Sequence, residues 1–211
     1  MRYGGNQKKE RLAAFHQKSI LKSACKLFQK NGIAGTTMDD IAKHADYSKT
    51  TIYHYFGSKD AIVSHLLFEG AELFKTRIQE DAERSKNFSD FYERLTKTIV
   101  EIQSKHPIHY TGIAGDIQFD ENASTTDLHR KTYLSNEETS GIIENKINAA
   151  IASKEISIAD KTEPFILFIL FCIMGLVENS AKKEDYITYK LGITREEFLE
   201  FAFHKLFGFF R

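Results

Sequence analysis

The sequence predicts an all-α protein, and two observations support this fold class. Its 211 residues include only 2 prolines, so few positions would interrupt a helix. Apolar residues recur every three or four positions along most of the chain, as in helices with one buried face, and no valine-rich alternating run indicates a strand. Because 42% of the residues are hydrophobic, the chain can bury a large core.

Three helices are expected within the first sixty residues. The apolar pattern predicts the first at about residues 10–30. The string Thr36-Thr37-Met38-Asp39 offers a hydroxyl cap with a carboxylate three residues further on, which predicts the start of a second helix of about nine residues. A turn at residues 45–47 then leads to Ser48, which predicts the cap of a third short helix at residues 49–55.

The rest of the chain is expected to be helical apart from a few connections. Five helices are expected at residues 58–82, 88–106, 127–153, 164–181 and 194–210. Residues 107–126 are ambiguous, with a short helix followed by a loop as the expectation, and residues 189–194 look like a turn. The apolar run at residues 165–177 must be covered on both faces, and its roughly 13 residues fall short of the roughly 20 that a membrane span needs.

The two ends of the chain differ in charge, although the net charge is zero. Residues 1–60 hold eleven Lys and Arg against five Asp and Glu, a net charge of +6, which leaves −6 for residues 61–211. DNA phosphates reward positive charge only where the protein touches them. The distribution is therefore typical of a DNA-binding head joined to a body that does not touch DNA.

Several other classes of protein find no support in the sequence. No phosphate-binding glycine loop, nucleophile elbow or cysteine with a local base is present, so we expect neither an enzyme nor a cofactor. A metal site could be suspected at His106, His109, Asp116 and His129. These residues lack the spacing of a helical ligand pair, so we expect surface histidines and no metal site.

The cysteines and the N-terminus bear on location. Cys25 and Cys172 lie far apart in apolar helical patterns, so we expect reduced, buried thiols. The N-terminus lacks an apolar segment with a cleavage site, so we expect no secretory signal, a cytoplasmic location and no membrane partner.

The first three helices have the plan of a helix-turn-helix, in which the third helix enters the major groove of DNA. Ile52 is expected to anchor that helix inward, against apolar residues of the first two. The side chains expected to contact DNA are Lys49, Thr50, Thr51, Tyr53, His54 and Lys59. The threonines are short enough to reach base edges, whereas the tyrosine, the histidine and the second lysine can donate to phosphates.

The stretch from Ile20 to Leu67, ILKSACKLFQKNGIAGTTMDDIAKHADYSKTTIYHYFGSKDAIVSHLL, resembles the DNA-binding signature of the bacterial TetR family. The resemblance implies a helix-turn-helix domain at residues 1–57 and a helical regulatory and dimerisation domain at 58–211, connected by the helix at 58–82. It further implies a homodimer on a palindromic operator of double-stranded DNA, usually a repressor that a small ligand releases. By the same resemblance Thr37 caps onto a phosphate, beside the DNA contacts named above.

The turn of the helix-turn-helix departs from the family pattern at two positions. Asp46 stands where the family usually has glycine, because the turn needs a positive φ, which aspartate tolerates at modest cost. Tyr47 replaces a small aliphatic residue, so local packing is expected to differ, with a direct DNA contact by Tyr47 as an open alternative.

The last two helices occupy the place of the family's dimer-forming pair. Exposed in a monomer, an all-round apolar helix and an aromatic-rich one would form a large apolar patch, which a two-fold interface would bury. The residues expected there are Phe165, Phe171, Met174, Phe198, Phe201 and Phe209. The alternative is that both helices serve only the core of their own chain.

The helices that surround the family's ligand cavity predict an apolar, aromatic lining for a small effector of unknown identity. The candidate lining residues are Phe91, Tyr92, Leu95, Ile99, Tyr110, Ile113, Tyr133, Phe168 and Cys172. Effector entry would displace the helix at 58–82 and change the separation of the two heads. The alternative is a DNA-binding adaptor whose body recruits a protein; it would have a filled core, whereas a sensor would have an enclosed cavity.

Overall fold

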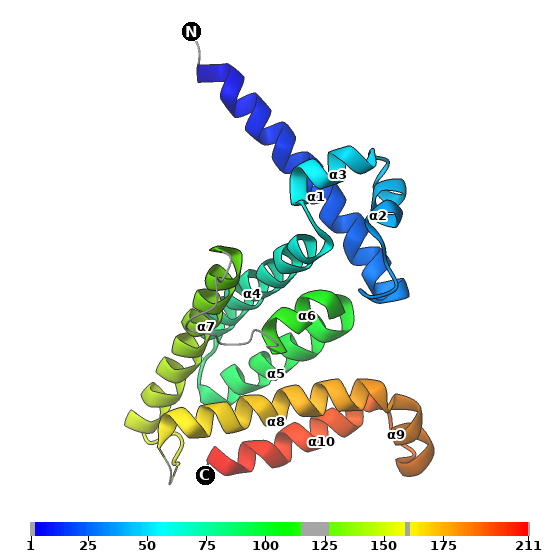
Figure 1. The fold of residues 1–211 in the computed structure, drawn as a ribbon. Helices are drawn as coiled ribbons and strands as arrows, with labels where there is room; N and C mark the ends of the chain where they lie inside the picture. Colours follow the sequence, from blue (N-terminus) through cyan, green and yellow to red (C-terminus); the bar gives the residue numbers. More distant parts are fainter. Residues whose placement is uncertain (1–2, 115–126, 159–160, 211) are drawn as a thin grey trace.

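The computed structural model describes residues 3–114, 127–158 and 161–210, and within these ranges the chain is helical with no strand (Figure 1). The elements are α1 (Tyr3–Asn31), α2 (Met38–Ala45), α3 (Lys49–Phe56), α4 (Lys59–Arg84), α5 (Phe88–Lys105), α6 (Pro107–Ala114), α7 (Asp127–Ala152), α8 (Thr162–Lys182), α9 (Glu184–Leu191), α10 (Arg195–Phe207) and a final 3-10 turn, η1 (Gly208–Phe210). The all-α fold class is confirmed.

Two elements differ from the sequence expectation. Helix α1 begins at Tyr3 instead of near Glu10. The short helix expected within residues 107–126 forms as α6, and the loop expected after it lies outside the described residues. Helix α9 was not expected. It has no side-chain cap at its start and is anchored by the buried Ile187, and Gly192 in the left-handed conformation ends it.

The described residues pack into two apolar cores, which meet within α4. The head core comes from α1, α2, α3 and the first two turns of α4, including Ile62 and Leu66. The body core begins at Phe74 on the same helix and takes in α5 to α8, α10 and η1. Ile108 of α6 packs against the head core, although α6 otherwise belongs to the body. A domain boundary at residue 57 therefore stays a proposal, because the head core extends into α4.

Helices α4 and α6 cross with their backbones almost in contact, which two glycines permit. A Cβ atom on Gly70 would lie 2.2 Å from the carbonyl oxygen of His109, and one on Gly112 would lie 2.4 Å from that of Leu67. On either side of this crossing α6 holds the two cores together, with Ile108 toward the head and Tyr110 in the body. Any movement of α4 is therefore shared with α6.

The head and the body occupy opposite ends of the molecule in Figure 1, with α4 running from one to the other. The N-terminal half of α1 projects beyond the rest of the head, on the side away from the body. At the opposite end α8 and α10 lie side by side, as their contacts also show. The helix-turn-helix and the expected dimer helices are thus far apart in one chain.

Candidate nucleic-acid interface

The entry to α2 is fixed by a reciprocal cap. The Asp40 backbone N–H donates to the Thr37 hydroxyl at 3.1 Å, and the Thr37 backbone N–H donates to the Asp40 carboxylate at 3.0 Å. The Thr37 hydroxyl also donates to that carboxylate at 2.6 Å, and these bonds from Thr37 hold the pKa of Asp40 below its ordinary value. The hydroxyl expected to reach a phosphate is thus engaged within the cap, although Thr37 is exposed.

The turn between α2 and α3 has the geometry that its sequence predicts. Asp46 has φ 60° and ψ 44°, the left-handed conformation that a glycine usually supplies, and its N–H closes the end of α2. Tyr47 is half-buried, and its hydroxyl lies 2.6 Å from Nδ1 of His16 on α1. This bond, which spans 31 residues of sequence, ties the turn to α1.

Helix α3 presents polar side chains to solvent and buries apolar ones. Ser48 caps it by accepting from the Thr51 N–H at 3.1 Å, and Ile52 is completely buried in the head core. The four residues expected on the outer side are all exposed: Lys49, Thr50, Tyr53 and His54. Thr51 is half-buried, with its hydroxyl 2.7 Å from that of Ser48. The exposed face therefore offers an ammonium, a hydroxyl, a phenol and an imidazole together.

The two lysines expected to contact DNA have different surroundings. Lys49 pairs with Asp39 at 2.7 Å with both side chains more than half exposed, and Asp39 raises the pKa of Lys49. Such an exposed pair contributes little to stability and can exchange for a phosphate. Lys59 instead donates to the carbonyl oxygens of Ile33 and Thr36 at 2.8 and 3.0 Å, which holds the connection between α1 and α2. The sequence did not indicate this structural role.

An exposed helix held by a tight turn against two buried helices is the arrangement of a helix-turn-helix DNA-binding domain. Residues 20–66 match the family model described as "Bacterial regulatory proteins, tetR family". The chain is similar to the HTH-type transcriptional regulator YhgD of Bacillus subtilis, with 32% identity over 92 residues, covering 44% of this chain and 48% of YhgD. It is also similar to IcaR of Staphylococcus aureus, named as a negative transcriptional regulator of the biofilm operon icaADBC, with 30% identity over 88 residues, 41% of this chain and 47% of IcaR.

The chain spans about half the length of the curated relatives it matches, whereas structural similarity covers nearly all of it. The crystal structure of FadR from Bacillus subtilis, solved in complex with stearoyl-CoA, matches 92% of this chain and 99% of that chain with a TM-score of 0.70 and 18% identity. Residues 20–66 thus match the DNA-binding region of TetR-family regulators, and the fold of nearly the whole chain is similar to that of solved structures of such regulators.

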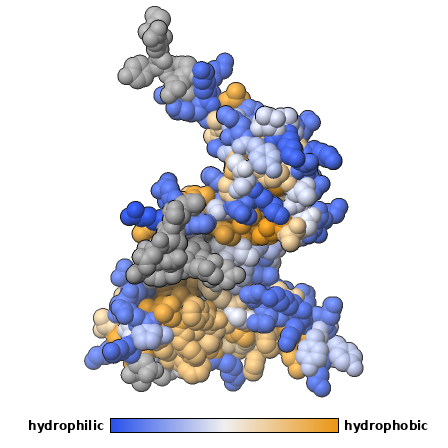
Figure 2. All heavy atoms as spheres, in the orientation of Figure 1, coloured by the Kyte–Doolittle hydropathy of each residue, from blue (hydrophilic) through white to orange (hydrophobic). Residues whose placement is uncertain are grey.

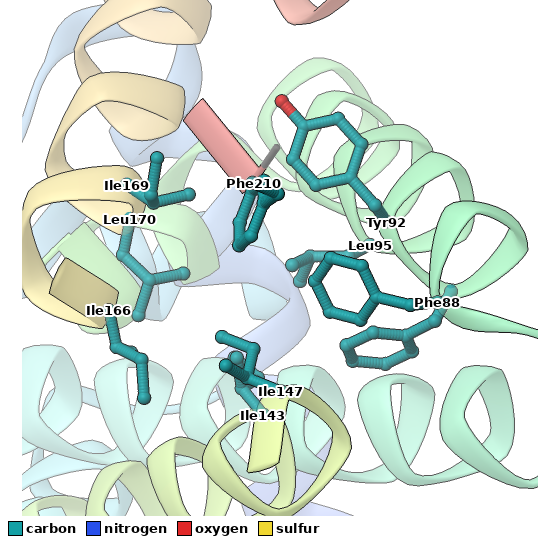
Figure 3. A pocket seen from close by; sticks show the side chains of 10 residues that line it. Phe88, Tyr92, Leu95, Ile143, Ile147, Ile166, Ile169, Leu170 and Phe210 are labelled. Atoms are coloured by element: carbon teal, nitrogen blue, oxygen red, sulfur yellow. The ribbon is translucent and has the colours of Figure 1, made fainter. Parts of the chain in front are cut away.

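The body core contains an apolar pocket, which Figure 3 shows between α5, α7, α8 and η1. Its lining residues are Phe88, Phe91, Tyr92, Leu95, Ile143, Ile147, Ile166, Ile169, Leu170 and Phe210. The free volume is about 10 Å³, roughly the space that one water molecule needs. The Tyr92 hydroxyl points out of the pocket and donates to the Phe203 carbonyl oxygen at 3.0 Å. The pocket is closed in this conformation.

The residues expected to line a ligand cavity are only partly brought together. Three of the nine, Phe91, Tyr92 and Leu95, line the pocket. Ile99, Tyr110 and Ile113 are buried in the same core but do not line the pocket. Cys172 is half-buried, and so is Cys25, which corrects the expectation of buried thiols. Tyr133 and Phe168 are 39% and 46% exposed, which corrects their assignment, because their helices turn them away from the core.

Helix α8 is apolar on two faces, and α10 lies beside it. Its buried face contains Phe165, Ile166, Ile169, Leu170, Ile173 and Val177. The exposed face of α8, α10 and η1 contains Leu167, Phe168, Phe171, Phe201 and Phe209, each 46% to 68% exposed. Figure 2 shows an apolar surface over this end of the molecule. We call these five residues the apolar face.

The residues expected at a dimer interface divide between these faces. Phe171, Phe201 and Phe209 belong to the apolar face, whereas Met174 and Phe198 are half-buried against the body core. Phe165 is 7% exposed and packs edge-on against Phe210, with ring centroids 5.1 Å apart. It therefore belongs to the core of its own chain, which corrects its assignment. By length and composition α8 could also cross a membrane, a property that core helices of soluble proteins share.

Among the described residues no group of three or more His, Cys, Asp and Glu side chains is placed to hold a metal ion. His106 is exposed, but His109 is mostly buried and faces Glu69 of α4, with 3.6 Å between Nε2 and Oε2. His129 lies with Nε2 2.9 Å from the Ser64 hydroxyl. Asp116 lies outside the described residues. Two of the expected surface histidines thus connect helices.

Proposed function

We propose that the chain is a repressor that binds a palindromic operator as a homodimer and inserts one α3 helix from each copy into successive major grooves. The observation that carries this proposal is the exposed face of α3, where Lys49, Thr50, Tyr53 and His54 stand together on a helix whose other side is fixed by the buried Ile52. Short hydroxyl side chains read base edges, and cations and other N–H and O–H donors hold phosphates. Binding to chromosomal DNA would place the protein in the cytoplasm.

The apolar face supports the dimeric part of the proposal. Three of its phenylalanines, Phe171, Phe201 and Phe209, are each more than half exposed. Monomeric proteins rarely expose contiguous apolar surface of this kind, and a two-fold interface covers such a face with its own copy. The face lies at the end of the molecule opposite α3, so pairing through it leaves both heads free for DNA (Figure 1).

Selection from a random duplex library with the full chain, followed by fluorescence anisotropy, tests the DNA-binding proposal. We expect an inverted repeat whose half-sites lie about 34 to 36 Å apart, bound at least about a thousandfold more tightly than a scrambled duplex. Failure to prefer any duplex over the scrambled one would refute the proposal.

Two substitutions on α3 sharpen this test. Thr50→Ala should change which base pairs are preferred, with about 1 to 3 kcal/mol of discrimination lost at one position. Lys49→Gln should weaken binding to all duplexes. Thr76→Ala is the matched control, because Thr76 is exposed on α4 and its hydroxyl bonds only to the Glu72 carbonyl of its own helix.

Release by a small effector is the second part of the proposal, and the apolar pocket is the observation that favours it. A pocket lined by hydrocarbon side chains suits an apolar effector, and the complex of FadR with stearoyl-CoA shows that a protein of this fold can bind an acyl compound. Since the free volume is about 10 Å³, the effector would have to displace core side chains. The adaptor hypothesis also predicts a filled core, so an experiment must distinguish an effector sensor from an adaptor.

A chain-length series of saturated fatty acids, measured by thermal unfolding and by operator affinity, separates them. A sensor should show a rise in Tm of several degrees, since an effector at 100 times its Kd adds about 2.7 kcal/mol, together with weaker operator binding. Ile147→Phe, which adds side-chain volume at the pocket and so opposes the opening that an effector needs, should weaken both effects. An unchanged Tm and unchanged operator affinity across the series would favour the adaptor.

A further inference from the structure

The N-terminal part of α1 extends beyond the head core. The first α1 residue of that core is Ile20, and one turn before it His16 contacts the turn between α2 and α3 through Tyr47. Residues 3–15, which we call the arm, continue the helix for about 20 Å at the usual rise of about 1.5 Å per residue. Figure 1 shows the arm leaving the head on the side away from the body. The match to the family model begins at residue 20, so the arm lies outside it.

The arm is basic and exposed. Lys8, Lys9 and Arg11 follow within four positions and are all exposed. Leu12 and Phe15 are 56% and 67% exposed, so neither side chain is buried in the head. A helical segment of this length without tertiary packing is marginally stable in water, so its sequence favours a surface that supplies further contacts.

The arm begins beside α3. The His16 ring bonds to the Tyr47 hydroxyl at 2.6 Å, and Tyr47 immediately precedes the cap of α3. The same ring lies 5.9 Å from the ring of Tyr55 within α3. The arm therefore leaves the head at the flank of α3, and its length of about 20 Å exceeds the roughly 12 Å width of a major groove.

We propose that the arm binds the phosphate backbone of duplex DNA that flanks the site entered by α3, through Lys8, Lys9 and Arg11. This inference rests on the proposed function, because it takes the DNA to lie against α3. Three cations within four residues match the closely spaced phosphates of a duplex, and backbone contacts outside the base-reading site add affinity without sequence preference. The arm lengthens the footprint of each head on DNA.

The test compares two lengths of the duplex that selection recovers, one trimmed to the inverted repeat and one with twelve base pairs added at each end. The variant Lys8→Gln/Lys9→Gln/Arg11→Gln should bind the extended duplex at least tenfold more weakly than the unmodified chain does. The slope of log affinity against log salt should fall by up to roughly 3 per protomer. On the trimmed duplex the two proteins should differ by less than threefold.

The matched control is Lys22→Gln/Lys26→Gln/Lys30→Gln, which removes the same charge from three exposed positions of the same helix within the head. It should leave the difference between the two duplexes intact. If it weakens binding to the extended duplex as much as the arm variant does, net charge explains the effect and the inference fails. The inference also fails if the arm variant binds both duplexes normally, whereas failure of selection to recover any duplex refutes the proposed function itself.

A second variant distinguishes DNA from protein as the partner of the arm. Leu12→Ser/Phe15→Ser removes the exposed apolar side chains and keeps every charge. Sedimentation should show an unchanged oligomeric state, and the extended duplex should still be preferred. A change of oligomeric state would make the arm a contact between copies of the chain and overturn the proposal.

Discussion

The head and the body expose opposite kinds of chemistry. The head core buries its apolar residues and α3 presents polar side chains to solvent, whereas the body buries one apolar surface and leaves another, which includes Phe171 and Phe201, in solvent. The α3 face suits the DNA proposed above, and the apolar face suits the second copy of the chain proposed above. The two ends of one molecule therefore offer surfaces of different chemistry.

The largest effect is expected from a substitution on the apolar face. If the proposed dimer forms through this face, Phe171→Asp should convert it to a monomer, because a carboxylate buried between copies would lack a partner. Operator binding should weaken by about 100-fold or more, because a single head lacks the avidity that two linked heads have on two half-sites. Sedimentation and anisotropy measure the two effects.

The control for this change is Tyr189→Asp on α9, which alters a side chain that is 87% exposed and lies outside the apolar face. It should leave the dimer and the operator affinity intact. A Phe171→Asp protein that stays dimeric would show that something other than this face joins the copies.

The next effect concerns the crossing that connects the two cores. Gly70→Ala should lower the free energy of unfolding by about 1 to 3 kcal/mol, because the added Cβ meets the His109 carbonyl oxygen at 2.2 Å and α4 and α6 must move apart. Gly141→Ala on α7 is the matched control, since its Cβ would meet nothing within 4 Å. That change should raise stability by about 0.5 to 1 kcal/mol through helix propensity. Urea unfolding of both variants measures the two changes in the free energy of unfolding. Changes of the same sign in the two variants would contradict this prediction.

The smallest effect depends on pH and also lies at this junction. Contacts with Cys25 of α1 and Glu69 of α4 raise the pKa of His109 from 6.5 to about 9, against a burial that lowers it. The His106 ring lies nearby, with centroids 5.7 Å apart, and Nδ1 of His109 has no hydrogen-bond partner. The Glu69 carboxylate is the stronger cause, because it lies 3.6 Å from Nε2, whereas Nδ1 makes no hydrogen bond to the Cys25 sulfur.

A pKa that folding raises means that protonation of His109 stabilises the folded state. This contribution is complete below about pH 6.5 and is lost as the pH rises through about 9. His109→Gln should therefore lower the free energy of unfolding by about 1 kcal/mol at pH 6, with a smaller loss at pH 9.5. His44→Gln, at an exposed position of α2, is the control and should give no such trend. A loss that does not vary with pH would contradict the assignment.

How much the sequence could predict also differs between the two ends. In the head, the helix caps and the left-handed turn depend on residues within a few positions of one another, so sequence rules for caps and turns predict them. These features are the caps at Thr37 and Ser48 and the left-handed Asp46. The bond between His16 and Tyr47 and the two bonds from Lys59 span 23 to 31 residues and leave no periodic signal, so they could not be foreseen.

In the body, the sequence identified α8 as apolar all round but could not say which face its own chain would cover. That choice depends on how α8 turns against α5 and α10, which is why Phe165 was assigned to the wrong face. Helix α9 was missed because its cap lacks a side-chain hydrogen bond. The closed pocket could not be predicted, since its volume depends on how the side chains interlock.

The division of α4 between the two cores has a consequence for engineering. A chimaera that joined this head to another regulator's body directly after Gly57 would discard Ile62 and Leu66, the two α4 residues that are fully enclosed in the head core. A chimaera that keeps the head core intact would be joined between Leu66 and Phe74. The new body would then also have to supply a side chain of similar shape to Ile108, which packs against the head core.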